Sequence, residues 1–191
     1  MEASGIKKLQ TLLIEIGLKI AKRGEGALFV VGNCDYKPMI EQTVPPFKAV
    51  DNPKLLESLA LMDGAVIIDR TGVVRAYGAM IKSTNPFKNF GTRHGAAFSA
   101  SHNGNLVVLV SEEDKKVKIF RNKKMIMQID ALQKNVEQSV PKVINLLESI
   151  GAGAVGTIGT GLLYPQFGIA LLPGIIVFGS AYYLTKLFLR K

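Results

Sequence analysis

Apolar residues recur at helical spacing near the start of the chain, while lysine and arginine occupy the opposite side of the same stretch. This period is typical of an amphipathic helix with one buried face. Ser4 precedes the stripe and is a suitable N-cap. We therefore predict that residues 1–25 form an amphipathic helix packed on the domain that follows. Its apolar stripe consists of Ile6, Leu9, Leu13, Ile16 and Ile20.

Short apolar runs bounded by turn residues then follow, and these are typical of buried strands. The runs ALFVV at residues 27–31 and NLVVLVS at residues 105–111 each predict one strand. In DGAVIIDRTGVVRAYGAMI, residues 63–81, two apolar segments flank the turn DRTG and predict a hairpin. A further pair of strands is expected in VKIFRNKKMIMQI, residues 117–129, around Arg121 and Asn122.

Helical signals separate these strands. Pro53 precedes KLLESLALM and suits the first turn of a helix, and a short helix is expected to begin near Thr92. Helix is predicted to return at Ala131, whereas the proline-containing residues 34–53 predict an extended loop. Residues 26–148 are therefore predicted to form one α/β domain, with a mixed central β-sheet flanked by helices.

The C-terminal part of the chain has a different composition, because residues 149–185 include no charged side chain. This run exceeds the roughly 20 apolar residues that one membrane-spanning helix needs. Two arrangements stay open, a hairpin of short helices turning at YPQ, residues 164–166, and a single span over about residues 167–189. A buried helical hairpin in a soluble protein is the alternative.

Basic residues close the chain at Lys186, Arg190 and Lys191, and positive residues beside a span prefer the cytoplasmic side. We therefore expect residues 149–191 to form a hydrophobic helical segment in the cell membrane, with the folded domain on the cytoplasmic side. The glycine-rich GAGAVG, residues 151–156, has the letters of a dinucleotide-binding fingerprint. A helical pattern precedes it and no acidic residue follows Glu148, so it lacks the strand and the ribose ligand of that fingerprint and is assigned to the membrane segment.

The net positive charge of the chain indicates which classes of partner it can bind. The 191 residues include 24 Lys and Arg against 15 Asp and Glu, a formal net charge of +9, which favours nucleic acid, nucleotide phosphates or an anionic lipid surface. Tyrosine and phenylalanine lie mostly in apolar runs instead of along a basic stripe, so no nucleic-acid partner is expected. The single cysteine, Cys34, excludes an internal disulfide.

Two short stretches carry residues suited to phosphate chemistry, DGA at residues 63–65 and GTRHGAA at residues 91–97. An aspartate at the mouth of a strand, here Asp63, can hold a divalent cation or accept a proton from a hydroxyl, or it can be a solvated turn residue. Gly91 permits a sharp turn and Thr92 can cap a helix whose first N–H groups then bind phosphate. Arg93 adds a bidentate donor, while His94 is a metal ligand, a phosphate donor or a structural residue.

These two motifs, in this order, resemble the signature of the diadenylate cyclase (DAC domain) family, whose members condense two ATP into cyclic di-AMP and two pyrophosphates. RGEGALFVV resembles the first strand of that family, DGAVIIDRTGVV its central hairpin, and SEEDKKVKIFRNKKM the strand pair after the second motif. The resemblance covers residues 26–125. It implies a membrane-anchored member of the family, since other members are anchored in membranes as well.

The resemblance also implies roles for particular residues. Asp63 would be the catalytic residue, which holds Mg²⁺ or Mn²⁺ and orients or deprotonates a 3′-hydroxyl. The active form would be a face-to-face homodimer or higher homo-oligomer in which each protomer binds one ATP. Metal ligands would be Asp63, His94 and Glu113, although Glu113 in SEED also fits a solvated acidic turn. Nucleotide contacts would come from Gly64, Ala65, Gly91, Thr92, Arg93 and His94, with Leu28 and Met80 lining a slot for adenine.

One position departs from the family, which writes its second motif as GTRHR where this chain has Gly95. A phosphate contact is therefore missing or comes from elsewhere, for example from Lys82 or Lys88 in the preceding loop, each of which also fits a solvated lysine. Two hypotheses stay open. The chain is a metal-dependent cyclase, or it is a membrane-bound sensor of ATP or another nucleotide without turnover.

Overall fold

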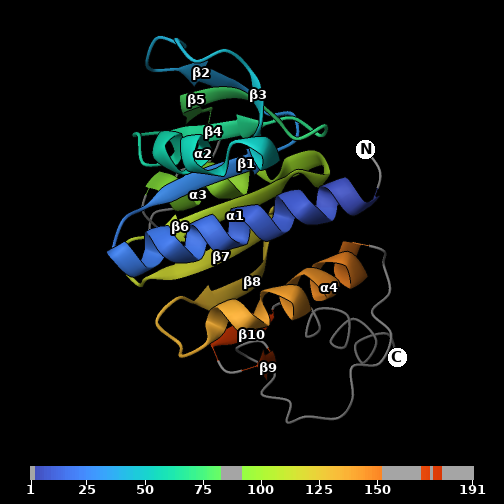
Figure 1. Ribbon diagram of the computed structural model, residues 1–191. Helices are drawn as coiled ribbons and strands as arrows, with labels where there is room; N and C mark the ends of the chain where they lie inside the picture. Colours follow the sequence, from blue (N-terminus) through green and yellow to red (C-terminus); the bar gives the residue numbers. More distant parts are fainter. Residues whose placement is uncertain (1–2, 83–91, 152–168, 173, 178–191) are drawn as a thin grey trace, which may run out of the picture.

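A computed structural model describes residues 3–82, 92–151, 169–172 and 174–177 (Figure 1). Within them, ten strands form one sheet in the order β2-β5-β4-β1-β6-β7-β8-β10-β9, and β3 pairs with β5. The strands are β1 Ala27–Val31, β2 Tyr36–Pro38, β3 Phe47–Lys48, β4 Ala65–Ile68, β5 Val73–Ile81, β6 Leu106–Ser111, β7 Lys116–Arg121, β8 Lys124–Asp130, β9 Ile169–Leu172 and β10 Ile175–Val177.

The described helices lie on both faces of this sheet, so the predicted mixed sheet flanked by helices is confirmed for this part of the chain. Residues of β1 alternate between two cores, Phe29 in one and Leu28 with Val30 in the other, as the period of two along a strand requires. One core includes residues from α1, α2 and α4, and the other lies beneath α3. The α-helices are α1 Ala3–Arg23, α2 Pro53–Ala60, α3 Thr92–Ala100 and α4 Val140–Gly151.

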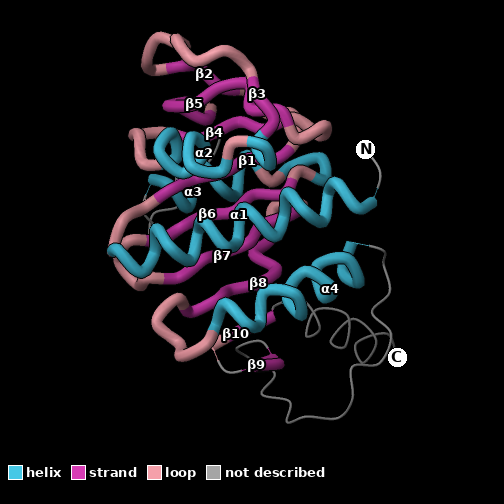
Figure 2. Tube along the Cα trace, viewed as in Figure 1, coloured by secondary structure: helices cyan, strands magenta, loops and turns pink. Residues whose placement is uncertain are grey.

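The N-terminal helix α1 runs across the middle of the sheet (Figure 2). Leu13 and Ile20 of its predicted stripe are fully buried, whereas Ile6 is 43% exposed at the beginning of the helix. Because the helix begins at Ala3, Ser4 lies inside its first turn and the predicted N-cap at Ser4 is wrong. At Gly17 a Cβ atom would lie 3.3 Å from Val110, so a glycine lets the helix approach the sheet closely.

Most elements expected between residues 27 and 130 are present, including the hairpin of β4 and β5 and the helix that begins at Pro53. The expected loop at residues 34–53 also contributes β2, β3 and the 3₁₀ helix η1 Ala49–Asp51. Side chains also hold this region to β5, and the residues that carry them follow no hydrophobic period in the sequence. The Gln42 amide exchanges two hydrogen bonds with the backbone of Tyr77, and the Tyr77 hydroxyl accepts one from the Val44 N–H.

The helix expected from Ala131 begins later, so that prediction is wrong for residues 131–135. Asn135 has a left-handed backbone with φ 59°, which ends any continuous helix there. The 3₁₀ helix η3 Val136–Ser139 comes next, and α4 follows from Val140. Pro141 lies in the first turn of α4, where a proline costs no backbone hydrogen bond. A third 3₁₀ helix, η2 His102–Gly104, follows α3.

The described part of the C-terminal segment is extended. Strand β10 pairs with β8 through Ile175 and Ile129, and β9 pairs with β10. The prediction of a helix is therefore wrong here, because branched apolar residues join the edge that β8 offers. In the described residues, no helix combines the length and the apolar character needed to span a bilayer. Residues 152–168 and 178–191, with most of GAGAVG, lie outside the described residues.

Candidate active site

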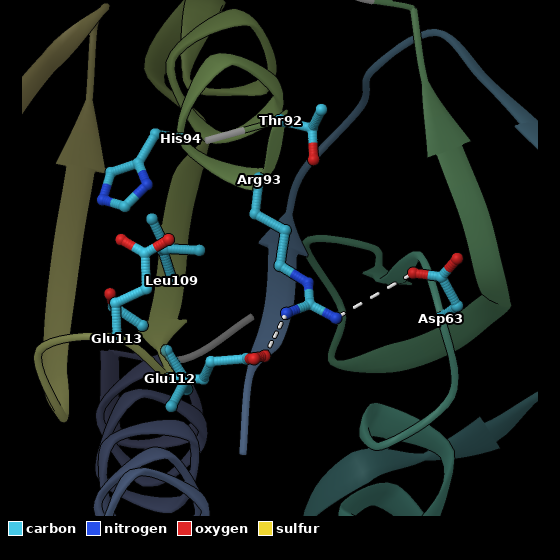
Figure 3. Close-up of a pocket in the computed structure, with 9 residues that line it drawn as sticks. Asp63, Thr92, Arg93, His94, Leu109, Glu112 and Glu113 are labelled. Atoms are coloured by element: carbon cyan, nitrogen blue, oxygen red, sulfur yellow. Dashed lines mark hydrogen bonds and ion pairs between the residues drawn. The ribbon is translucent and has the colours of Figure 1, made fainter. Parts of the chain in front are cut away.

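An open pocket of about 260 Å³ lies at one end of the central strands of the sheet. At this end of the sheet, strands β1 and β4 begin, β6 ends and the N-terminus of α3 faces the opening (Figure 3). Both sequence motifs therefore contribute to one site, together with the end of β6. The pocket is lined by Asp63, Thr92, Arg93, His94, Leu109, Val110, Ser111, Glu112 and Glu113.

The DGA motif places a carboxylate at the mouth of the pocket. Gly64 has φ +104°, and a Cβ atom there would lie 2.7 Å from the backbone of Gly78 and Ala79. Only glycine fits this close approach of the β4 start to β5. Ala65 is fully buried, whereas the side chain of Asp63 is 90% exposed. Gly64 and Ala65 thus shape the turn that presents the Asp63 carboxylate to solvent.

Arg93 lies between two carboxylates. Its Nη1 donates a hydrogen bond to Glu112 Oε2 over 3.0 Å, and its Nη2 lies 3.9 Å from Asp63 Oδ1. The Arg93 side chain is 38% exposed, so its guanidinium is accessible from the pocket. An arginine held in this way presents a planar set of donors that matches phosphate oxygens.

Gly26 makes room for this arginine and is a site residue that sequence reasoning missed. A Cβ atom at Gly26 would lie 2.3 Å from Arg93 Nη1 and 3.3 Å from Glu112 Oε2. The side chain of Arg93 thus packs directly over the backbone at the start of β1. No sequence signal distinguishes such a glycine from one that ends a helix.

His94 and Glu113 lie at one end of the pocket and Asp63 lies at the opposite end, with Arg93 between them (Figure 3). The Nε2 of His94 lies 3.0 Å from Nζ of Lys118 in β7, which in turn lies 2.8 Å from Asp114 Oδ2. Burial and the Lys118 charge lower the pKa of His94, against the raising effect of nearby carboxylates. Sequence reasoning missed Lys118, although a lysine between apolar residues of a predicted strand was a visible signal.

The remaining predicted residues are placed differently. Thr92 is exposed at the first position of α3 and lines the pocket. Gly95 is buried within α3, and Lys82 is exposed just after β5. Gly91 and Lys88 lie outside the described residues.

The two residues expected to contact adenine lie on different parts of the sheet. Leu28 is 3% exposed and packs in the core beneath α3, whereas Met80 is 50% exposed on β5. Neither is among the described residues that line the pocket. Their contact with adenine stays a prediction.

The donors at the site suit a hard divalent cation. Asp63, Glu112 and Glu113 place three carboxylates around one pocket, and oxygen ligands are those that Mg²⁺ and Mn²⁺ prefer. Among the described residues, no three His, Cys, Asp or Glu side chains are grouped closely enough to hold an ion by themselves. Mg²⁺ commonly binds through one or two carboxylates with substrate phosphates completing its shell, so the residues fit an ion that arrives with a nucleotide.

Comparison with known proteins gives one matching family model, one similar curated protein and two similar solved structures. The family model described as DisA bacterial checkpoint controller nucleotide-binding, DAC, matches residues 17–125. A diadenylate cyclase from Haloferax volcanii is 30% identical over 139 residues, which are 62% of this chain and 51% of that protein. The chain thus spans about half the length of this curated relative.

The crystal structure of a double mutant of DacA from Staphylococcus aureus superposes with a TM-score of 0.50 at 22% identity, covering 81% of this chain and all of the other. This likeness concerns the fold, in which a mixed α/β sheet carries helices on its faces. A hypothetical membrane spanning protein from Bacillus cereus gives a TM-score of 0.45 at 25% identity, over 59% of this chain and 60% of its own.

Proposed function

This chain belongs to the DAC family, the DisA bacterial checkpoint controller nucleotide-binding family, and we propose that it is a diadenylate cyclase that condenses two ATP into cyclic di-AMP and two pyrophosphates. The observation that carries the proposal is the position of Arg93 beside the carboxylates of Asp63 and Glu112 in one open pocket. A cation for phosphate and an exposed acid for a hydroxyl or a metal ion are the groups that nucleotidyl transfer needs. Membership in the family and the likeness to a diadenylate cyclase support the same reaction.

The reaction assigns a task to each group. A 3′-hydroxyl oxygen of one ATP attacks the α-phosphorus of the other, a P–O bond forms, and the bond from the α-phosphorus to the β-bridging oxygen breaks to release pyrophosphate. Asp63 orients the hydroxyl and accepts its proton. Arg93 binds the phosphate oxygens as charge shifts toward the leaving group. The same step then repeats with the two nucleotides exchanged.

The helix start contributes further donors. The first N–H groups of an α-helix have no acceptor within the helix, and the residues that begin α3, Thr92 to His94, line the pocket. Anions bind there through these groups and through the helix dipole. Thr92, Arg93 and His94 would therefore hold the triphosphate, and the carboxylates of Asp63 and Glu113 would hold Mg²⁺ or Mn²⁺. When bound, the ion neutralises phosphate charge and lowers the barrier to attack.

The proposed reaction uses two protomers, because it consumes two ATP and each protomer would bind one. A homodimer that places two pockets face to face brings each 3′-hydroxyl to the α-phosphate of the opposite ATP. A higher homo-oligomer can present the same pairing.

The test is to incubate the purified chain with ATP and either Mg²⁺ or Mn²⁺ and to identify the products by mass. We expect cyclic di-AMP and pyrophosphate from the native chain and at least a hundredfold less, on the order of one lost acid–base catalyst, from Asp63→Asn. The matched control is Asp35→Asn, which alters an exposed acid outside the pocket lining and leaves the rate unchanged. ATP bound without any product would overturn the enzyme and leave a nucleotide sensor, which is the outcome that Gly95 in place of the family arginine would favour.

Attachment to the cytoplasmic side of a cell membrane stays a prediction that rests on the uncharged residues 149–185. It predicts that the full chain floats with lipid vesicles in a density gradient and that a chain ending at residue 148 does not. Equal flotation, or none by either chain, would contradict it.

A further inference from the structure

The end of the sheet opposite the pocket carries cationic side chains that have no task in the reaction above. Strand β6 begins at this end and runs to the pocket, whereas β7 ends here and β8 begins. The turn between β7 and β8 consists of Arg121, Asn122, Lys123 and Lys124, of which the last three are exposed. Three cations are therefore close together at this end.

The 3₁₀ helix η2 joins this turn to the one between β4 and β5. Asn122 Oδ1 accepts a hydrogen bond from the Gly104 N–H over 3.0 Å. Arg70, which is exposed in the turn between β4 and β5, donates from Nη2 to the Asn103 carbonyl over 3.3 Å. The Arg70 cation thus belongs to the same surface as the turn after β7.

Arg121 is the cation whose surroundings most clearly lack an anion. The period of two along β7 places its side chain on the same face as Val117 and Ile119, beneath α1. The side chain is half-buried, and its Nε is buried without an acceptor among the described residues. Burial lowers the pKa of the guanidinium, and no carboxylate in the described part of the chain opposes that effect. A charge in such a place costs free energy unless an anion approaches it.

The first turns of α1 reach the same end of the molecule. Gly17 lies over Val117, where a Cβ atom would be 3.3 Å from the valine side chain, and Gly24 after the helix lies beside Lys115. The helix therefore runs opposite to β7 and begins toward the end where β7 stops. Lys8 is exposed in this part of the helix. The cations of this region, called the basic end below, are Lys8, Arg70, Arg121, Lys123 and Lys124.

Two carboxylates at this end are already paired with other cations. Asp69 Oδ2 lies 2.7 Å from Arg75, and Glu148 Oε2 lies 3.4 Å from Lys7. Neither pair includes a cation of the basic end. The basic end therefore keeps positive charge that attracts an external anion.

Uncharged chain segments adjoin the basic end. The last turns of α4 lie beside the first turns of α1, because Lys7 Nζ donates to Asn145 Oδ1 over 2.9 Å. Figure 1 shows α4 ending on the side of the molecule where the N-terminus lies. Strand β10 is antiparallel to β8, so it runs toward the end where β8 begins. The uncharged residues 149–185 therefore begin at this end, and those after Val177 follow a strand that points to it.

We propose that the basic end binds the anionic phospholipid headgroups of a membrane, with the Arg121 guanidinium as one phosphate ligand, and that the pocket faces away from that membrane. Clusters of Lys and Arg beside an apolar segment bind anionic lipid surfaces in this way. The uncharged residues 149–185 favour a lipid headgroup over a nucleic acid as the source of the phosphate. This surface goes beyond the proposed reaction and does not depend on it.

The test compares two positions on the full chain in a Cys34→Ser background. One fluorophore is attached either through Ser4→Cys, in the first turn of α1, or through Gln138→Cys in η3, beside the last turn of α1. Vesicles with a quencher on the headgroup consist of phosphatidylcholine alone or of equal parts phosphatidylcholine and phosphatidylglycerol. We expect strong quenching at position 4 and weak quenching at position 138 on the anionic vesicles, with the signal at position 4 lost at high salt. Equal quenching at both positions, stronger quenching at position 138, or no dependence on phosphatidylglycerol overturns the proposal.

Charge variants test the basic end itself. Arg121→Gln combined with Lys123→Gln is expected to raise the lipid concentration for half-maximal quenching at position 4 about twentyfold, or about fivefold per charge. The matched control is Lys19→Gln combined with Lys134→Gln, which removes two exposed lysines outside the basic end and should change it less than about twofold. Equal effects of the two pairs would mean that only net charge matters and would overturn the proposal.

Arg121→Met separates lipid binding from folding, because methionine keeps an apolar stem in the half-buried place. We expect its midpoint of urea unfolding to equal or exceed that of the native chain, since an unpaired charge is removed, while the lipid concentration for half-maximal quenching rises about fivefold. Lower stability with an unchanged lipid response would make Arg121 a structural residue and overturn its assignment.

Two further outcomes separate this inference from its alternatives. Duplex RNA that binds the native chain but not Arg121→Gln with Lys123→Gln, without any preference for anionic vesicles, overturns it in favour of a nucleic-acid surface. Cyclic di-AMP formed by a chain that shows no such preference leaves the proposed function standing and removes this inference alone. An anionic preference in a chain that makes no cyclic di-AMP does the reverse.

Discussion

At the scale of single residues, the account depends on where one guanidinium lies. Arg93 rests over the backbone of Gly26 and donates to Glu112, and its other end approaches Asp63. The position of Arg93 in the sequence motif indicated a phosphate ligand, but its partners come from the start of β1 and the end of β6. Contacts between residues so far apart in the chain have no periodic signal in sequence.

The backbone at Gly26 gives the first prediction. A methyl group in Gly26→Ala would lie within 2.3 Å of Arg93 Nη1 and displace the guanidinium. We expect the KM for ATP to rise about tenfold, the scale of one charge-assisted contact. Steady-state kinetics of cyclic di-AMP formation measure this change.

The control is Gly24→Ala in the same loop, where the nearest foreign atom to a Cβ lies 3.8 Å away on Lys115. Gly24 has φ +74°, so alanine there costs stability without moving Arg93. Equal changes in KM for the two variants would show that the loop, and not the guanidinium, governs binding.

A second prediction concerns Asp69 in the turn between β4 and β5. Burial alone would raise the pKa of Asp69, but hydrogen bonds from Thr71, Val73 and Arg75 lower it from 3.8 to about 2. A carboxyl with a lowered pKa stabilises the fold above its unfolded pKa and loses that effect as the pH falls toward its folded pKa. We expect Asp69→Asn to cost about 1–2 kcal/mol at pH 7.

Urea unfolding of the native chain and Asp69→Asn across this pH range measures the difference. The two free energies of unfolding should converge as the pH falls from about 4 to about 2. A difference that is the same at both ends of the range would mean that the carboxylate charge has no part in holding the turn.

At the scale of elements, the hydrophobic pattern predicted the sheet well and the connections less well. Strands such as β6 and β7 are continuous apolar runs between turn residues, and the stripe of α1 is a clear helical period. Local pattern decides such elements. Strands β2 and β3 were missed because each is only two or three residues long and has no apolar run; both pair with β5 through the backbone. The loop between them is held to β5 by the Gln42 amide and the Tyr77 hydroxyl.

The C-terminal strands show a second limit of pattern. An uncharged apolar run has the composition of a membrane helix, but the segment around Ile175 pairs with β8. Whether such a run becomes helix or strand depends on the presence of an unpaired edge, which a linear pattern does not reveal.

Helix α1 gives a prediction at this scale. Leu13 is fully buried against the sheet, so Leu13→Ala should lower the free energy of unfolding by about 3 kcal/mol through lost burial and a cavity. Ile6→Ala, on the same stripe but 43% exposed, should cost less than about 1 kcal/mol. Chemical denaturation compares them, and equal losses would contradict the packing of α1 on the sheet.

At the scale of the whole molecule, the proposed reaction needs two pockets, each of which holds one ATP. The rate per protomer should therefore rise with protein concentration until the dimer saturates. Initial rates over a dilution series, with the mass in solution determined by light scattering, test this dependence. A rate per protomer that is constant while the chain is monomeric would contradict the face-to-face arrangement.

The most direct test of the central claim is an isotope-mixing experiment. The full chain is incubated with equal amounts of unlabelled ATP and uniformly ¹⁵N-labelled ATP, and the cyclic dinucleotide is analysed by mass. If two ATP molecules condense at the Asp63 and Arg93 site, the mixed product should be twice as abundant as either pure product and should disappear in Asp63→Asn. Bound ATP that gives no mixed product, or a mixed product that persists in Asp63→Asn, would contradict the account.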